Sequence, residues 1–161
     1  MEILNISKGE IHYPVGYNFQ NNLPTIMEMI KVFKSSFLYK KILKEKARIN
    51  FICGGSSGSI IATVFAQNIP NSYIHYVRKG GEIGHNHYSL RENRYNIIVD
   101  DFTVTGETIK RLVRNSFKDD KENEELHAVI LSGIVNDYRF IDKEHKQYPK
   151  LLICTEYIER K

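Results

Sequence analysis

The spacing of apolar positions along the 161-residue chain changes near residue 24 and again near residue 49. Between 24 and 46 they recur at steps of three and four, which predicts one long amphipathic helix. Beyond residue 48, short apolar runs rich in Ile, Val, Leu and Tyr alternate with stretches of helical spacing. Five of these runs are predicted strands, at 49–53, 73–77, 95–99, 128–131 and 151–154.

Two segments with helical spacing, 60–67 and 108–117, lie between predicted strands. Strands that alternate with helices, and that are apolar almost throughout, are typical of a parallel sheet covered on both faces. The pattern therefore predicts an α/β fold, a parallel twisted sheet of about five strands with helices on both faces. Residues 1–22 contain several turn signals and predict turns with at most a brief hairpin.

Composition fits one folded domain, because 42% of the residues are hydrophobic and 26% are charged. The net charge of +4 is enough to attract anions but does not by itself indicate a nucleic-acid binder. The lysine-rich face of the long helix is interpreted as a solvated surface. Cys53 and Cys154 lie in apolar runs and are predicted to be buried free thiols of a cytoplasmic protein. No apolar stretch approaches the ~20 residues of a membrane helix.

Three polar, glycine-containing loops directly follow predicted strands, at 54–58, 78–92 and 100–108. In parallel sheets the ligand binds beyond the carboxyl ends of the strands. We therefore expect all three loops to meet at one edge of the sheet and to form the functional site.

The third of these loops carries the most specific pattern, which reads VDDFTVTGET from Val99. Free N–H groups at a helix start bind phosphate, Gly106 lets the backbone approach closely, and threonine hydroxyls add donors. Asp100 and Asp101 suit ribose hydroxyls, a Mg²⁺ ion or a developing cation. A phosphate site beside two acids indicates a phosphorylated sugar. The alternative is that Asp100 and Thr105 are ordinary helix caps.

The segment from Asn96 to Ile109, which contains this loop, resembles the phosphoribosyl-diphosphate motif of type I phosphoribosyltransferases over more than a dozen positions. The resemblance implies transfer of ribose 5-phosphate from 5-phosphoribosyl 1-diphosphate (PRPP) to a nucleobase nitrogen, with release of diphosphate. Mg²⁺ is expected to arrive with PRPP rather than on direct protein ligands. The resemblance implies that the catalytic residues include Asp100 and Asp101, and that the PRPP-binding residues are Thr103, Val104, Thr105, Gly106, Glu107 and Thr108.

The loop after the first of the five predicted strands is a flexible, amide-rich turn that enters a helix and could hold an anion. It is no Walker loop, because the Gly-Lys-Ser/Thr ending is missing. Taken alone, it could be an ordinary tight turn. By resemblance it corresponds to the family's diphosphate loop, made of Gly54, Gly55, Ser56, Ser57 and Gly58.

The loop after the second of these strands is similar to the family's mobile catalytic loop, which begins with Arg-Lys. Arg78 and Lys79 would then close over the diphosphate and offset its charge. Glu82 departs from the family pattern, since a second lysine commonly lies there, and His85 could substitute as a donor. An ordinary glycine-rich surface loop is the alternative. The pair His85 and His87 is poor evidence for zinc.

The resemblance covers about 49–132 and leaves the ends of the chain open. We predict a single domain with a core of about 24–132 and a small hood, built from about 1–22 and 133–161, that covers the base. Tyr138 and Phe140 could stack on the base or belong to the core. A short likeness at Ser7-Lys8-Gly9 and Tyr13 suggests an orotate phosphoribosyltransferase-like start.

The acceptor base is not determined by these residues, so both a pyrimidine enzyme of orotate type and a purine salvage enzyme of nucleotide metabolism fit. The expected partners are PRPP and a nucleobase, with a possible homodimer and no nucleic acid or membrane. The alternative function is a non-catalytic regulator that binds PRPP or a nucleotide.

Overall fold

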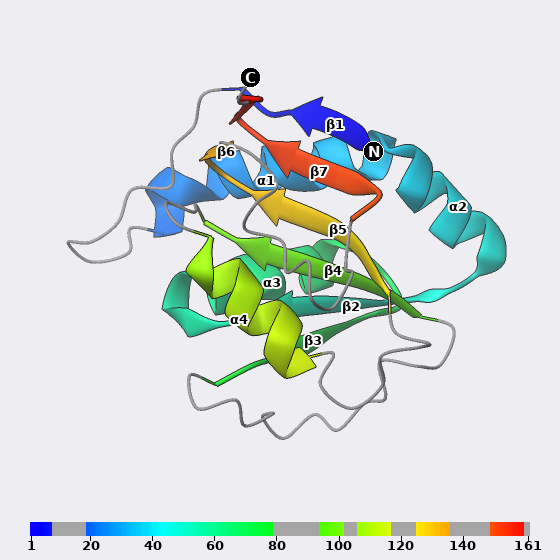
Figure 1. Ribbon diagram of the computed structural model, residues 1–161. Helices are drawn as coiled ribbons and strands as arrows, with labels where there is room; N and C mark the ends of the chain where they lie inside the picture. Colours follow the sequence, from blue (N-terminus) through cyan, green and yellow to red (C-terminus); the bar gives the residue numbers. More distant parts are fainter. Residues whose placement is uncertain (8–18, 79–93, 102–105, 117–124, 136–148, 160–161) are drawn as a thin grey trace.

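The computed structural model centres on a six-stranded sheet in which every neighbouring pair is parallel (Figure 1). The strand order is β1-β7-β5-β4-β2-β3. The structure describes residues 1–7, 19–78, 94–101, 106–116, 125–135 and 149–159. The sheet strands are β1 (Glu2–Asn5), β2 (Arg48–Cys53), β3 (Ser72–Tyr76), β4 (Arg94–Asp100), β5 (Leu126–Leu131) and β7 (Leu151–Cys154).

The predicted α/β fold is confirmed, and all five predicted strands are present. The expectation of turns or a hairpin at the start of the chain is wrong for residues 2–5. They form β1, which extends the sheet in parallel beside β7, with Glu2 opposite Leu151. Its four residues alternate between half-buried and exposed, and this pattern is too short to predict a strand. A separate parallel pair joins β6 (Ile134–Val135) to β8 (Glu156–Tyr157).

Four helices accompany the described strands: α1 (Phe19–Ser35), α2 (Phe37–Glu45), α3 (Gly55–Asn68) and α4 (Glu107–Ser116). The prediction of one helix over 24–46 is wrong, because the helix is interrupted at Ser36. Ser36 has an extended backbone, and its Oγ accepts a hydrogen bond from Tyr39 N at 3.1 Å. The same hydroxyl donates to Phe33 O at 2.6 Å. This side chain thus ends one helix and starts the next.

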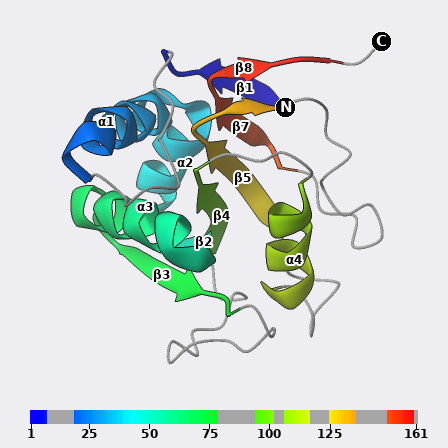
Figure 2. The ribbon, with the colours of Figure 1, turned by 90° about the vertical axis from the view of Figure 1, so that its left-hand side faces the viewer.

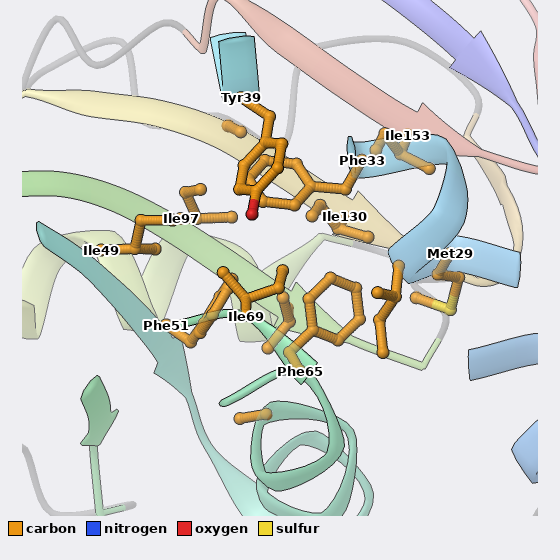
Figure 3. Close-up of a cluster of buried hydrophobic side chains, with 14 of the residues drawn as sticks. Met29, Phe33, Tyr39, Ile49, Phe51, Phe65, Ile69, Ile97, Ile130 and Ile153 are labelled. Atoms are coloured by element: carbon orange, nitrogen blue, oxygen red, sulfur yellow. The ribbon is translucent and has the colours of Figure 1, made fainter. Parts of the chain in front are cut away.

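The helices cover both faces of the sheet, with α1, α2 and α3 on one face and α4 on the other (Figure 2). The first face packs around Phe33, Phe51 and Phe65, whose ring centroids lie 5.2–6.4 Å apart (Figure 3). The second face packs Ile98 of β4 and its neighbours against Leu112 of α4. Because both faces are buried, the central strands are apolar almost throughout.

A buried polar network crosses the central strands near their amino ends. Asn50 of β2 donates from Nδ2 to Asn96 Oδ1 of β4 at 3.1 Å. Arg94 Nη1 donates to Asn50 Oδ1 at 3.2 Å. Asn96 Nδ2 in turn donates to Glu125 O, just before β5, at 3.1 Å. The network links three segments at the edge opposite the predicted loops.

Cys53 and Cys154 are free and fully buried, as predicted. Burial raises the pKa of Cys53 to about 12 and the pKa of Cys154 to about 11, so both remain neutral thiols near pH 7. In the described part of the chain, no helix has the length and apolar character required to span a bilayer.

Candidate functional site

The loops predicted to carry chemistry follow β2, β3 and β4, which are adjacent in the sheet. Parallel strands end at the same edge, so Gly54, Arg78 and Asp101 begin their segments side by side. Val77 N donates to Cys53 O at 2.9 Å and joins the first two segments directly. For the described residues, the expected gathering at one edge is confirmed.

Asp100 and Asp101 are both buried at the end of β4, with 5% and 8% of their surface exposed. Asp101 N donates to Asp100 Oδ1 at 2.9 Å. The carbonyl oxygen of Asp101 accepts from Ser132 Oγ at 2.8 Å and also from Ser132 N. Ser132 directly follows β5, so two central strands hold the pair of acids in position.

The surroundings of Asp100 favour its neutral form. Burial raises its pKa to about 8, and the charge of Asp101 and a side-chain hydrogen bond to Asp101 act in the same direction. A backbone hydrogen bond from Asp101 and the charge of Arg111 lower the pKa, without overcoming the burial. Near pH 7 Asp100 therefore retains its proton in a substantial fraction of the molecules and can donate as well as accept a hydrogen bond.

The expectation of a flexible turn at 54–58 needs correction, because residues 55–58 form the first turn of α3. The helix begins at Gly55, and Gly54 precedes it with no side-chain hydrogen bond to cap it. Gly55 has a φ of +74°, a conformation that side chains rarely adopt. The first N–H groups of a helix lack partners within the helix, so this uncapped start is suited to an anion.

Two glycines allow α3 to begin very close to β4 and α4. A Cβ on Gly58 would lie 3.3 Å from Asp100 Oδ1. A Cβ on Gly54 would lie 3.0 Å from Leu112 Cδ2 and 3.2 Å from Val77 O. The predicted diphosphate segment and the pair of acids are thus in direct proximity.

Arg111 of α4 also reaches this edge and was missed by the sequence analysis. Its Nη2 would lie 3.8 Å from a Cβ on Gly54, and its positive charge lowers the pKa of Asp100. The side chain is half-buried. A signal was present, because Arg111 lies one helical turn after Thr108 and shares its side of the helix.

The start of α4 carries the remaining described part of the motif. Gly106 has a φ of +78°, and its carbonyl accepts from Lys110 N at 3.0 Å. Thr108 is half-buried, whereas Glu107 is exposed. The carboxylate of Glu107 lies 3.6 Å from Lys110 Nζ and 3.9 Å from Arg114 Nη2. This carboxylate therefore makes ion pairs along its own helix.

Several predicted site residues lie outside the described part of the chain and remain predictions. Of the segment predicted to be a mobile loop, the described residues include Arg78 alone, whose side chain is exposed. The residues concerned are Lys79, Glu82, His85, His87, Thr103, Val104, Thr105, Tyr138 and Phe140.

The two acids at this edge are also candidate partners of a Mg²⁺ ion. Within the described segments, no group of three or more His, Cys, Asp or Glu side chains could hold a metal ion. Asp100 and Asp101 offer two adjacent carboxyl groups, and Mg²⁺ takes octahedral oxygen coordination that is often completed by water and ligand phosphates. The residues present therefore fit an ion that arrives with a diphosphate ligand, and this role remains a prediction.

Comparison with known families shows to which family the chain belongs. The family model described as PRTase-CE matches residues 13–161, which is nearly the whole chain. The chain belongs to the PRTase-CE family. No curated protein sequence matches it.

Solved structures share the fold of this PRTase-CE chain at low sequence identity. A purine phosphoribosyltransferase from Pyrococcus horikoshii is 12% identical with a TM-score of 0.50, covering 100% of this chain and 90% of that one. The AQ2163 protein from Aquifex aeolicus is 13% identical with a TM-score of 0.55, covering 98% and 88%. These likenesses show the phosphoribosyltransferase-like fold. The comparisons give no support to the orotate-like subtype.

Proposed function

We propose that this PRTase-CE chain transfers ribose 5-phosphate from PRPP to the nitrogen of a nucleobase and releases diphosphate. The observation that supports this most is the meeting of three features at one sheet edge. The uncapped start of α3, the buried pair of acids and the glycine-led start of α4 lie together there. PRPP has a phosphate at one end, a diphosphate at the other and hydroxyls between, so its groups match these features in kind.

Each feature then has one role. The backbone from Thr105 to Thr108 binds the 5-phosphate, because a helix start presents N–H groups and the positive end of the helix dipole. The first turn of α3 binds the diphosphate by the same physics. Asp100 and Asp101 bind the ribose hydroxyls, which both donate and accept hydrogen bonds. Mg²⁺ bound to the diphosphate supplies charge neutralisation for the leaving group.

The reaction exchanges one bond for another at the anomeric carbon of the ribose. The bond from this carbon to the diphosphate oxygen breaks, and the oxygen leaves with the electron pair. The base nitrogen then forms the new bond with its lone pair and loses a proton to solvent. Positive charge develops on the ring between these events, and the adjacent carboxyl groups of Asp100 and Asp101 stabilise it. Arg78 and Lys79 offset the negative charge of the departing diphosphate.

The acceptor base is tested directly with a panel. The full chain is incubated with PRPP and Mg²⁺ together with orotate, uracil, adenine, guanine, hypoxanthine or xanthine, and diphosphate release is measured. Release that depends on one base class supports the proposal and identifies the acceptor. Tight PRPP binding without diphosphate release on any base would contradict the enzymatic activity and support a non-catalytic regulator. The glutamate at position 82 favours this alternative.

We predict that Asp101→Asn lowers turnover by about 100-fold or more, because it removes one preorganised electrostatic group. The change is nearly isosteric, so little loss of folding is expected. Steady-state diphosphate release with the active base measures the effect. Glu125→Gln is the matched control, because Glu125 lies before β5 at the opposite sheet edge. Turnover of Asp101→Asn equal to that of the control would contradict the assigned role.

A further inference from the structure

The side chain of Arg111 has a buried donor group that is left without a partner in the described part of the chain. Its Nε is buried and has no hydrogen-bond partner among the described residues. Buried polar groups in proteins are nearly always hydrogen-bonded, and the desolvation of an unpaired donor is costly. An arginine that retains such a donor beside a candidate site therefore points to a ligand.

The position of the guanidinium specifies which part of that ligand it can reach. Arg111 Nη2 lies close to Gly54, the residue that precedes the uncapped start of α3. The positive charge of Arg111 also lowers the pKa of Asp100. The cation is therefore close to the diphosphate segment, while the proposed 5-phosphate site begins one helical turn earlier on α4.

We propose that Arg111 binds the diphosphate group of PRPP and holds it against the first turn of α3, an inference that rests on the proposed function. A guanidinium presents a rigid fork of N–H donors that matches phosphate oxygens in pairs. The N–H groups of α3 and the fork of Arg111 approach the same group from two elements. Together they form a binding site for two linked phosphates.

The sequence of the loop after β3 gives Arg111 added importance. That loop carries Glu82 at a position where phosphoribosyltransferases commonly have a second lysine. A cation on α4 does not depend on loop closure, because α4 is packed against the sheet through Leu112 and Val113. Arg111 thus supplies a positive charge from a helix packed against the sheet, whereas position 82 of the loop is a glutamate.

The competing interpretation is that Arg111 only offsets the charge of Asp100. In that case its removal would weaken every ligand that needs the pair of acids. A diphosphate-binding role instead predicts selective loss. Ligands with a diphosphate would bind more weakly, and a ligand with the 5-phosphate alone would not.

The test is calorimetric titration of the full chain, with Mg²⁺ present, using PRPP, inorganic diphosphate and ribose 5-phosphate as separate probes. Arg111→Gln is expected to raise the Kd of PRPP and of diphosphate by about tenfold or more, the size of one lost charge-assisted hydrogen bond. The Kd of ribose 5-phosphate should stay within a factor of about two. Arg111→Lys keeps the charge without the fork and should give an intermediate loss.

Arg114→Gln is the matched control, because Arg114 is an exposed arginine on the same helix and pairs with Glu107. It should leave all three affinities unchanged. Urea unfolding confirms that each variant is folded, and if Arg111→Gln does not fold, the selectivity of Arg111→Lys decides. Equal losses for all three probes, or no loss for any, would overturn the inference.

The same titrations separate this inference from the proposed function. If the wild-type chain binds diphosphate through Arg111 but releases no diphosphate from PRPP with any base, the inference about Arg111 holds and the proposed enzymatic activity is wrong. If the wild-type chain turns over a base while Arg111→Gln binds diphosphate normally, the proposed activity holds and the inference about Arg111 is wrong. Absence of binding by all three probes would overturn both.

Discussion

Asp100 shows how strongly a residue's chemistry depends on what surrounds it. The sequence places it beside Asp101 after an apolar strand, and this was enough to single it out. The structure adds that Asp100 is buried against Gly58 and accepts a hydrogen bond from Asp101 N. Burial is the largest of the effects that raise its pKa to about 8.

A pH dependence of stability follows from this shift. The unfolded chain releases the Asp100 proton near its ordinary pKa of 3.8, and the folded chain releases it near 8. The folded state therefore binds more protons between these values. The stabilising contribution of Asp100 is fully present below pH 4 and is lost as the pH rises toward 8.

Asp100→Asn should remove this dependence, because an amide imitates the protonated acid and does not titrate. The measurement is the urea midpoint of wild type and variant at several pH values from 5 to 8. His75 and His127 have lowered pKa values and act in the opposite direction, but they are common to both proteins. The difference between the two curves isolates Asp100. The variant should gain relative stability as the pH rises, and parallel curves would contradict the assignment.

At this scale the sequence predicted that the two acids lie at the end of a buried strand, but not the protonation of Asp100. The motif after β4 is local and could be read directly from consecutive residues. Arg111 could not be assigned in the same way, because its role depends on how α4 packs beside Gly54. The protonation of Asp100 likewise depends on contacts between segments far apart in the chain.

Among the elements, the break between α1 and α2 has a single local cause. Ser36 is fully buried, caps α2 at Tyr39 N and also donates to Phe33 O. The apolar spacing continues across this break, from Phe33 to Leu38, so periodicity predicted one helix where there are two. The serine was the available signal, but a serine inside a periodic pattern is weak evidence for a cap.

We predict that Ser36→Ala lowers the free energy of unfolding by about 1 kcal/mol, the usual cost of losing a cap. Ser35→Ala is a close control, since Ser35 is exposed and its hydroxyl donates to Val32 O at 2.7 Å without capping a helix. Urea unfolding of both variants gives the comparison. A loss in Ser36→Ala no larger than in the control would contradict the capping role.

The start of α3 is a second helix boundary that the local sequence pattern did not predict. The glycines and serines at 54–58 predict a turn, and the helix was expected only from residue 60. In the structure the helix begins at Gly55, because it packs against β4 through Gly58 and close to α4 through Gly54. Tertiary contacts extend the helix through residues of low helical propensity.

For the molecule as a whole, the alternation of strands and helices was sufficient to predict a parallel α/β sheet. The strand order was not, because β1 and β7 join the sheet from opposite ends of the chain. The order also decides which segments meet at the candidate site. It places the ends of β3, β2 and β4 next to one another, and these carry Arg78, the start of α3 and the two acids.

The central claim is that this one edge of the sheet binds PRPP. Amide chemical shifts of the isotopically labelled chain, followed by NMR as PRPP and Mg²⁺ are added, test it most directly. The account predicts that the largest changes fall at Gly55–Gly58, Asp100–Asp101 and Gly106–Thr108. Changes confined to the opposite edge around Asn50 and Asn96, or to the lysine-rich surface of α1 and α2, would contradict it.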